Sequence, residues 1–173
     1  MAMKGIQLGL RLWQFLWTLL IMALVGNMIA DSYGGNPATV NYTMFVVAFS
    51  MLTLFYLIPA TINLDWAIHP IFMIVLDTLN AIFFLTAGIA LAAKLECHSC
   101  SNSEYTLNNE ITNGSVHREK RCREAQASTA FLWFAWVGCM VSMVLSILMA
   151  RRSVNLRPRT GPARGARPSM AQV

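Results

Sequence analysis

Four long apolar segments constrain this chain more than any other feature of its sequence. They cover residues 12–30, 42–62, 71–93 and 125–150. A helix needs about 20 mostly apolar residues to cross the hydrocarbon core of a bilayer, and each segment is near or above that length. The chain of 173 residues is 56% hydrophobic and only 12% charged, which leaves too little polar surface for a soluble domain of this size. We therefore predict an all-α bundle of four transmembrane helices.

The predicted membrane domain covers residues 1–150. Its first segment has a longer apolar run than the h-region of a signal peptide, and no clear A-x-A cleavage site follows, so we expect it to stay in the membrane. The residues outside the four segments are too few to form a soluble catalytic domain. We therefore expect neither an enzyme nor a bound cofactor.

The distribution of positive charge predicts the orientation of the bundle. Lys4 and Arg11 precede the first segment. Six arginines follow the fourth segment without an accompanying acid: Arg151, Arg152, Arg157, Arg159, Arg164 and Arg167. The connection over residues 31–41 has no base, and the bases of residues 94–124 are balanced by acids. By the positive-inside rule both termini are cytoplasmic, and residues 94–124 form an extracellular loop.

The basic segment over residues 151–173 is rich in Arg, Pro and Gly, a composition that cannot bury a core. We predict a disordered cytoplasmic tail. Each basic residue near an anionic membrane surface contributes about 1 kcal/mol of attraction. The six arginines therefore indicate contact with anionic inner-leaflet lipid or an acidic partner, although they also fit a plain topology signal. The basic balance belongs to this tail and does not indicate nucleic-acid binding.

Asp77 raises the main functional question, because it lies inside the third apolar segment. At helical spacing it shares a face with Asn80 and Gly88. The fourth segment carries a similar stripe of small residues, which includes Gly138, Ser142 and Ser146. Small residues let helices approach closely in a membrane. We expect Asp77 and Asn80 to be polar packing residues of the bundle interior, and the small residues to form a helix interface.

Two functions are compatible with Asp77. An ionisable residue within a membrane is a candidate ion or proton site, which would suit a small ion- or proton-coupled transporter or channel component. A relay usually needs several ionisable groups, and Asp77 is expected to be the only charged residue within the four spans. Interhelical hydrogen bonding is therefore favoured. On this interpretation Asp77→Asn preserves assembly and Asp77→Leu disrupts it.

Three cysteines fall in the predicted extracellular loop, where a disulfide is the default. Either Cys100–Cys122 or Cys97–Cys122 would close the loop, which is worth about 3 kcal/mol in the chain-entropy account. The C-x-x-C of Cys97 and Cys100 also fits a redox pair or, with His98, His117 and Cys122, a zinc site, but it lacks the surroundings of either, and we predict no metal. Asn113-Gly114-Ser115 is a sequon, which makes Asn113 a possible glycosylation site.

Several short stretches occur together in a distinctive order. They are "VNYTMF" at 40–45, "LDTLNAIFFLTAGIALA" at 76–92, "HSC" at 98–100, "ITNGS" at 111–115 and "RCREAQASTAFLWF" at 121–134. In this spacing the chain resembles the fungal non-classical export protein family, which has a MARVEL-type four-helix membrane domain. The resemblance covers roughly residues 10–150 and the final "AQV".

The resemblance implies a multi-pass plasma-membrane protein of the sterol-rich, eisosome-associated compartment. It implies a role in organising sterol- and sphingolipid-rich membrane domains, a response to sphingolipid status, and a link to non-classical protein export. The expected partners are sphingolipid, sterol, further copies of the chain, and eisosome or cortical proteins. The resemblance also supports Cys100 and Cys122 as the paired cysteines, because they match the family's cysteine motifs and Cys97 does not.

Overall fold

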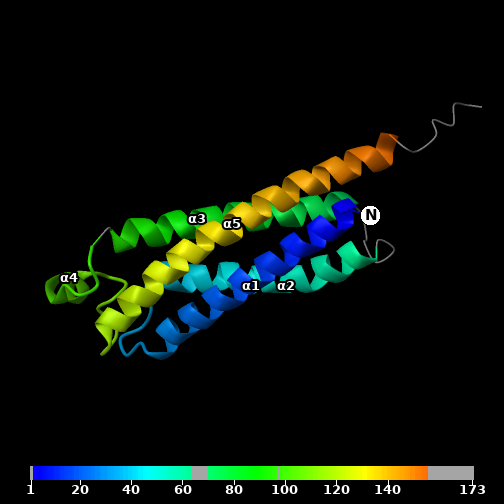
Figure 1. Cartoon of the computed structure of the whole chain (residues 1–173). Coiled ribbons are helices and arrows are strands. Elements are labelled where there is room, and N and C mark those ends of the chain that lie inside the picture. Colours follow the sequence, from blue (N-terminus) through cyan, green and yellow to red (C-terminus); the bar gives the residue numbers. More distant parts are fainter. Residues whose placement is uncertain (1, 64–69, 97, 156–173) are drawn as a thin grey trace, which may run out of the picture.

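The computed structural model describes residues 2–63, 70–96 and 98–155, which form five helices (Figure 1). They are α1 (Ala2–Ala30), α2 (Ala38–Ile62), α3 (Pro70–Leu95), α4 (Ser103–Asn108) and α5 (Arg118–Asn155). Within the described residues, the four helices other than α4 are long and apolar enough to cross a membrane. A helix suits this environment because all its backbone hydrogen bonds are internal. The predicted all-α, four-span class is confirmed.

The four long helices run side by side in one elongated bundle (Figure 1). α5 packs against both α1 and α3, and α2 packs against the same two helices. α1 and α3 therefore occupy opposite corners of the bundle. The N-terminus and the C-terminal end of α5 lie at one end, here called the terminal end. Residues 31–37 and 98–117 lie at the other, the loop end. Which side of the membrane each end faces stays a prediction.

Two helices begin earlier than the apolar pattern predicts. α1 begins at Ala2 instead of near residue 12, and α5 begins at Arg118 instead of near residue 125. The added turns carry polar residues, which hydropathy alone assigns to loops. Gln7, Arg11 and Arg121 are nevertheless fully or almost fully buried and hydrogen-bonded, so the helices continue through them.

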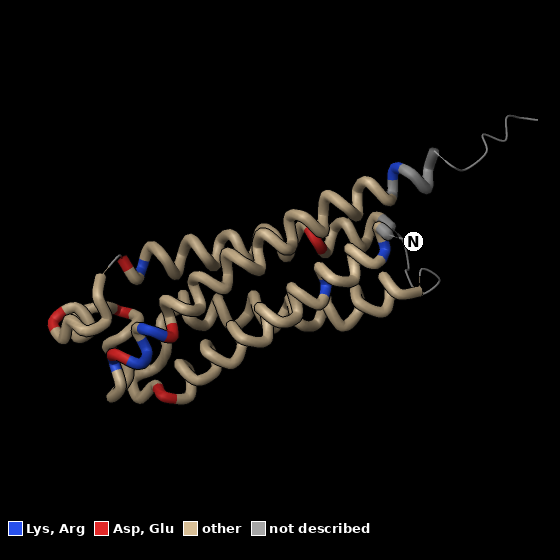
Figure 2. Tube along the Cα trace, in the orientation of Figure 1, with Lys and Arg blue, Asp and Glu red and all other residues tan. Residues whose placement is uncertain are grey.

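The interior of the bundle changes character along its length. A large apolar cluster fills the loop half and the centre, and includes Ile21, Val47, Phe84, Leu91 and Leu132. Polar side chains are buried in the terminal half, where a smaller apolar cluster of Leu57, Ala60 and Met73 lies between α2 and α3. Figure 2 shows charged positions gathered at the loop end and only isolated ones along the terminal half. The terminal half therefore holds the candidate site.

Candidate functional site

Asp77 lies on α3, about 10 Å along the helix from its start at Pro70. Its side chain is 1% exposed and faces the interior of the bundle. An unpaired carboxylate at such a position carries a large desolvation cost, so the partners of Asp77 decide what the residue does.

The main partner is Arg11 of α1, whose side chain is 0% exposed. Arg11 Nη1 donates to Asp77 Oδ1, and Arg11 Nη2 donates to Asp77 Oδ2 at 2.8 Å. Two parallel bonds of this kind are the bidentate form in which guanidinium recognises carboxylate most strongly. Because α1 and α3 occupy opposite corners, the pair spans the bundle diagonally. The expectation that Asp77 is the only charged residue within the spans is wrong, because α1 begins at Ala2 and so includes the buried Arg11.

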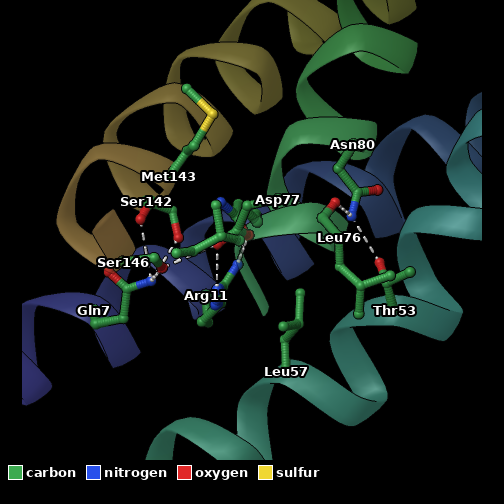
Figure 3. A network of polar contacts seen from close by, with 12 residues as sticks. Gln7, Arg11, Thr53, Leu57, Leu76, Asp77, Asn80, Ser142, Met143 and Ser146 are labelled. Carbon is green, nitrogen blue, oxygen red and sulfur yellow. Dashed lines mark hydrogen bonds and ion pairs between the residues drawn. The ribbon is translucent and has the colours of Figure 1, made fainter. Parts of the chain in front are cut away.

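Two serines bring α5 into the same cluster. Ser146 Oγ donates to Asp77 Oδ2 at 3.0 Å. Gln7 Nε2 donates to Ser142 Oγ at 2.7 Å and to Ser146 Oγ at 3.1 Å (Figure 3). Since the proton of Ser146 points to Asp77, its oxygen must accept from Gln7, and this fixes which end of the glutamine amide faces the serines.

Asn80 lies one turn beyond Asp77 on α3 and connects α3 to α2. Its Nδ2 donates to Thr53 Oγ1 of α2 at 2.8 Å and to the Leu76 carbonyl oxygen at 3.0 Å (Figure 3). Gln14 extends the cluster along α1 by accepting from Arg11 Nη1 at 3.3 Å. We call the whole set the polar network: Gln7, Arg11, Gln14, Thr53, Asp77, Asn80, Ser142 and Ser146. It contacts all four long helices.

The chemistry of the polar network favours holding helices together over moving protons. A guanidinium is not deprotonated in proteins, so Arg11 cannot pass a proton onward. Both carboxylate oxygens of Asp77 already accept hydrogen bonds, from Arg11 and from Ser146. Removing one member of a buried ion pair typically costs about 3–5 kcal/mol, because the other charge is left uncompensated. The pair therefore fixes α1 and α3 relative to each other.

A spacing on α1 could have predicted the missed partners. Gln7, Arg11, Gln14 and Thr18 follow one another at intervals of four, three and four residues, which places them on one helix face. All four side chains are buried in the bundle. A polar stripe at helical spacing indicates that the polar N-terminal residues continue the first helix and face inward.

The small residues expected to form one helix interface belong to two contacts. At Gly138 of α5, an added Cβ would lie 2.9 Å from Trp13 Cδ1, so the Trp13 side chain of α1 occupies the place that a larger residue would need. At Gly88 of α3, the nearest atom to an added Cβ would be Trp133 Cε2 of α5, at 3.6 Å. Ser142 and Ser146 lie further along α5 and bond to α1 and α3 as described above. The α5 stripe thus serves α1 as much as α3.

At the loop end, a disulfide joins Cys100 to Cys122, with 5.6 Å between their Cα atoms. These are the two cysteines that the resemblance implies, and neither sulfur is free to bind a metal. Cys97 lies outside the described residues. The disulfide ties the loop after α3 to the first turns of α5.

Arg121 is a second buried arginine, and the sequence interpretation did not single it out. Its side chain is 1% exposed and donates to the carbonyl oxygens of Ile111 at 2.6 Å and Met28 at 2.8 Å. A third bond, of 3.0 Å, goes to Asn36 Oδ1. Met28 lies in the last turn of α1, where carbonyl groups lack helical partners and a cation is favourable. Arg121 therefore holds both loops against the end of α1.

Asn113 of the sequon is exposed in a turn at the loop end. The Tyr33 hydroxyl donates to the Asn113 carbonyl oxygen at 3.0 Å, whereas Ser115 is 1% exposed. Glycosylation of Asn113 stays a prediction.

The basic tail lies mostly beyond the structure. α5 continues through residues 151–155, which the composition assigned to a disordered tail, and Arg151 is exposed. Arg152 lies on the same helix. The other tail arginines lie outside the described residues: Arg157, Arg159, Arg164 and Arg167.

Comparison with known proteins identifies the kind of bundle. Residues 3–145 match the MARVEL family, a membrane-associating domain. The chain is 33% identical over 174 residues to non-classical export protein 2 of Saccharomyces cerevisiae, and the alignment covers 95% of both chains. It is 34% identical over 171 residues to non-classical export protein 102 of Candida albicans, again with 95% of each chain covered. A Schizosaccharomyces pombe homolog of non-classical export protein 2 is 29% identical over 168 residues. No solved structure matches the chain.

Proposed function

Because this chain belongs to the MARVEL family and, within it, to the fungal non-classical export proteins, we propose that it organises lipids and proteins in the plasma membrane. The chain is a multi-pass membrane protein linked to non-classical export. The finer proposal is that it assembles sterol- and sphingolipid-rich domains of the eisosome type and responds to sphingolipid status. In this role it acts by packing and by lipid contact, and it performs no chemical reaction.

The observation that carries this proposal is the pairing of the Asp77 carboxylate inside the bundle. The intramembrane carboxylate is bound by Arg11 and Ser146, so the charge serves the bundle's own packing. The outward faces of the helices carry large apolar side chains, including Leu52, Phe55, Ile82 and Ile89. A rigid bundle with an apolar exterior offers surfaces to lipid tails and to neighbouring copies, and this is what a membrane organiser uses.

The same network argues against the transporter interpretation of Asp77. A carrier must release its acidic group to an ion in part of its cycle, whereas Asp77 is held by the bidentate bonds of Arg11. The large apolar cluster also fills the bundle between the polar network and the loop end. Flux of an ion through reconstituted protein that disappears in Asp77→Asn, with the bundle still folded, would restore the transporter interpretation.

The tail arginines provide a second contact in this proposal. They follow directly on the terminal end, which we expect to face the cytoplasm, and they attract anionic inner-leaflet lipid or an acidic cortical protein. Such a contact would link the bundle to partners beneath the membrane.

The direct experiment is to image a fluorescently tagged chain in the plasma membrane, before and after sphingolipid synthesis is blocked. We expect stable patches that disperse during the block. A uniform distribution that does not respond to the block would contradict the proposed function. As a folding check, the chain is extracted from the same cells in detergent and analysed by size-exclusion chromatography. A single monodisperse peak excludes misfolding as the cause.

A further inference from the structure

Four buried side-chain atoms of the polar network have no hydrogen-bond partner among the described residues. They are Gln7 Oε1, Arg11 Nε, Gln14 Nε2 and Asn80 Oδ1. Their side chains are at most 3% exposed. Buried polar groups in proteins are nearly always hydrogen-bonded, because an unpaired one loses its bonds to water without replacement. Four such atoms in one cluster therefore require an explanation.

Three of the four atoms belong to side chains that hydrogen bonds already connect, and the fourth belongs to the neighbouring Asn80. Gln14 accepts from Arg11, which places the unpartnered Nε2 of Gln14 beside the guanidinium. Gln7 is connected to Asp77 through Ser146. Asn80 follows Asp77 by one turn of α3. Reorienting the Gln7 amide does not help, since the Ser146 oxygen needs the Gln7 donor.

The mixture of donors and acceptors identifies the missing partner. Arg11 Nε and Gln14 Nε2 are donors, whereas Gln7 Oε1 and Asn80 Oδ1 are acceptors. A metal cation would satisfy only the acceptors and would be repelled by the guanidinium. An anion would satisfy only the donors and would be repelled by the Asp77 carboxylate. Water both donates and accepts, and buried waters in proteins typically make about three hydrogen bonds to such groups.

We propose that the polar network is an internal hydration site, in which ordered water molecules bridge α1 and α3 around the Arg11–Asp77 pair. Gln7 lies only about 8 Å along α1 from its start at Ala2, so the terminal end is the near source of water. The large apolar cluster separates the site from the loop end. Water would therefore reach the polar network from the terminal end and would not continue through the apolar cluster. This inference does not depend on the proposed function.

Water contact at Gln14 can be measured in the intact chain by solid-state NMR in lipid bilayers. The chain has four glutamines, Gln7, Gln14, Gln126 and Gln172, so side-chain 15N labelling of glutamine gives few signals. The experiment measures the rate at which magnetisation passes from water to each labelled side-chain amide. The signal of Gln14 is assigned as the one that is absent in Gln14→Leu. We expect the Gln14 amide to receive magnetisation within about twofold of the rate at the exposed Gln126.

Trp17 supplies the matched dry control. Its indole Nε1 is also a buried donor without a partner, but the ring packs against Phe131 and Phe134. We expect water transfer to a labelled Trp17 indole to be at least fivefold slower than to Gln14. Equally slow transfer to Gln14 and Trp17 would overturn the proposal.

A second variant tests whether the waters are shared. Asn80→Leu removes one acceptor and keeps a side chain of similar size, and we expect a several-fold loss of water transfer to Gln14. Ser128→Ala is the control, because Ser128 Oγ is a buried, unpartnered hydroxyl outside the polar network. Transfer to Gln14 should not change in that variant. Unchanged transfer in Asn80→Leu would exclude bridging water between α1 and α3.

Discussion

At the scale of single residues, the ion pair with Arg11 gives Asp77 a role in packing the bundle. Hydropathy treats an arginine as the end of a membrane span, and this criterion placed Arg11 outside the first helix. The charge is instead neutralised inside the bundle by a residue 66 positions away in sequence. No local pattern reports a partner at that distance. The inward orientation of Asp77 was predictable from the polar and small residues around it, whereas its ion pair required the packed structure.

Arg11 and Asp77 should show strong energetic coupling. Arg11→Met leaves a buried carboxylate without its cation, and we expect it to lower the free energy of unfolding by about 3–5 kcal/mol. The double variant Arg11→Met/Asp77→Leu removes both charges and should recover most of that loss. Unfolding of purified protein in mixed micelles, followed as a double-mutant cycle, measures the coupling. Additive losses in the double variant would show that the two side chains do not interact.

The ion pair also changes the expected result for Asp77→Asn. From the sequence alone, asparagine at position 77 is expected to preserve the hydrogen bonding of Asp77 and to be tolerated. With Arg11 buried beside it, an asparagine leaves the guanidinium without a counter-charge, so we now expect Asp77→Asn to be destabilising as well. In an Arg11→Met background the same substitution should have much less effect.

At the scale of the helices, the effect of adding a methyl group depends on which glycine is replaced. A Cβ at Gly138 would lie 2.9 Å from Trp13, whereas one at Gly88 would have its nearest neighbour at an ordinary 3.6 Å. We expect Gly138→Ala to destabilise the α1–α5 contact by about 1–3 kcal/mol through overpacking. Gly88→Ala should be neutral or stabilising, because alanine favours helix by up to about 1 kcal/mol. Thermal unfolding of the two variants compares them, and equal losses would contradict this assignment of the interface.

The loop-end disulfide gives a prediction that distinguishes the possible cysteine pairs. In Cys100→Ser, Cys122 loses its partner; because its side chain is buried, it should react with a maleimide once the protein is unfolded in denaturant without reductant. We also expect the loss of the cross-link to lower stability by about 3 kcal/mol. Mass spectrometry of the labelled protein locates the modified thiol. Continued protection of Cys122 would mean that Cys97 is its partner instead.

The lengths of the helices show where sequence patterns stop being informative. The apolar runs located all four spans, because a bilayer requires long apolar helices. They did not locate the first turns of α1 and α5, where Gln7, Arg11 and Arg121 are buried through specific hydrogen bonds. Hydropathy measures the average cost of burying a side chain and ignores any hydrogen-bond or ion-pair partner that the folded bundle provides.

At the scale of the whole molecule, the two ends of the bundle have different tasks. The loop end is held by the disulfide and by Arg121. The terminal end contains the polar network and leads into the basic tail. The start of α1 and the end of α5 both lie at the terminal end, which fits the prediction that both termini are on one side of the membrane (Figure 1).

The tail arginines should act on distribution and leave the fold unchanged. Replacing the six arginines over residues 151–167 by glutamine removes their attraction for anionic lipid, so we expect weaker patch formation with unchanged thermal stability. Fluorescence microscopy and an unfolding measurement on the same variant separate the two effects. An unchanged membrane distribution would reduce the arginines to a topology signal.

We propose that the chain organises the membrane by packing and that the Arg11–Asp77 pair holds its bundle together. The most direct test is to image Arg11→Met/Asp77→Leu in the plasma membrane beside the wild type and the two single variants. We predict that the double variant forms patches that disperse when sphingolipid synthesis is blocked, as the wild type does, and that each single variant fails to form them. A double variant that is folded and reaches the plasma membrane but forms no responsive patches would contradict the account, because the charges themselves would then be required.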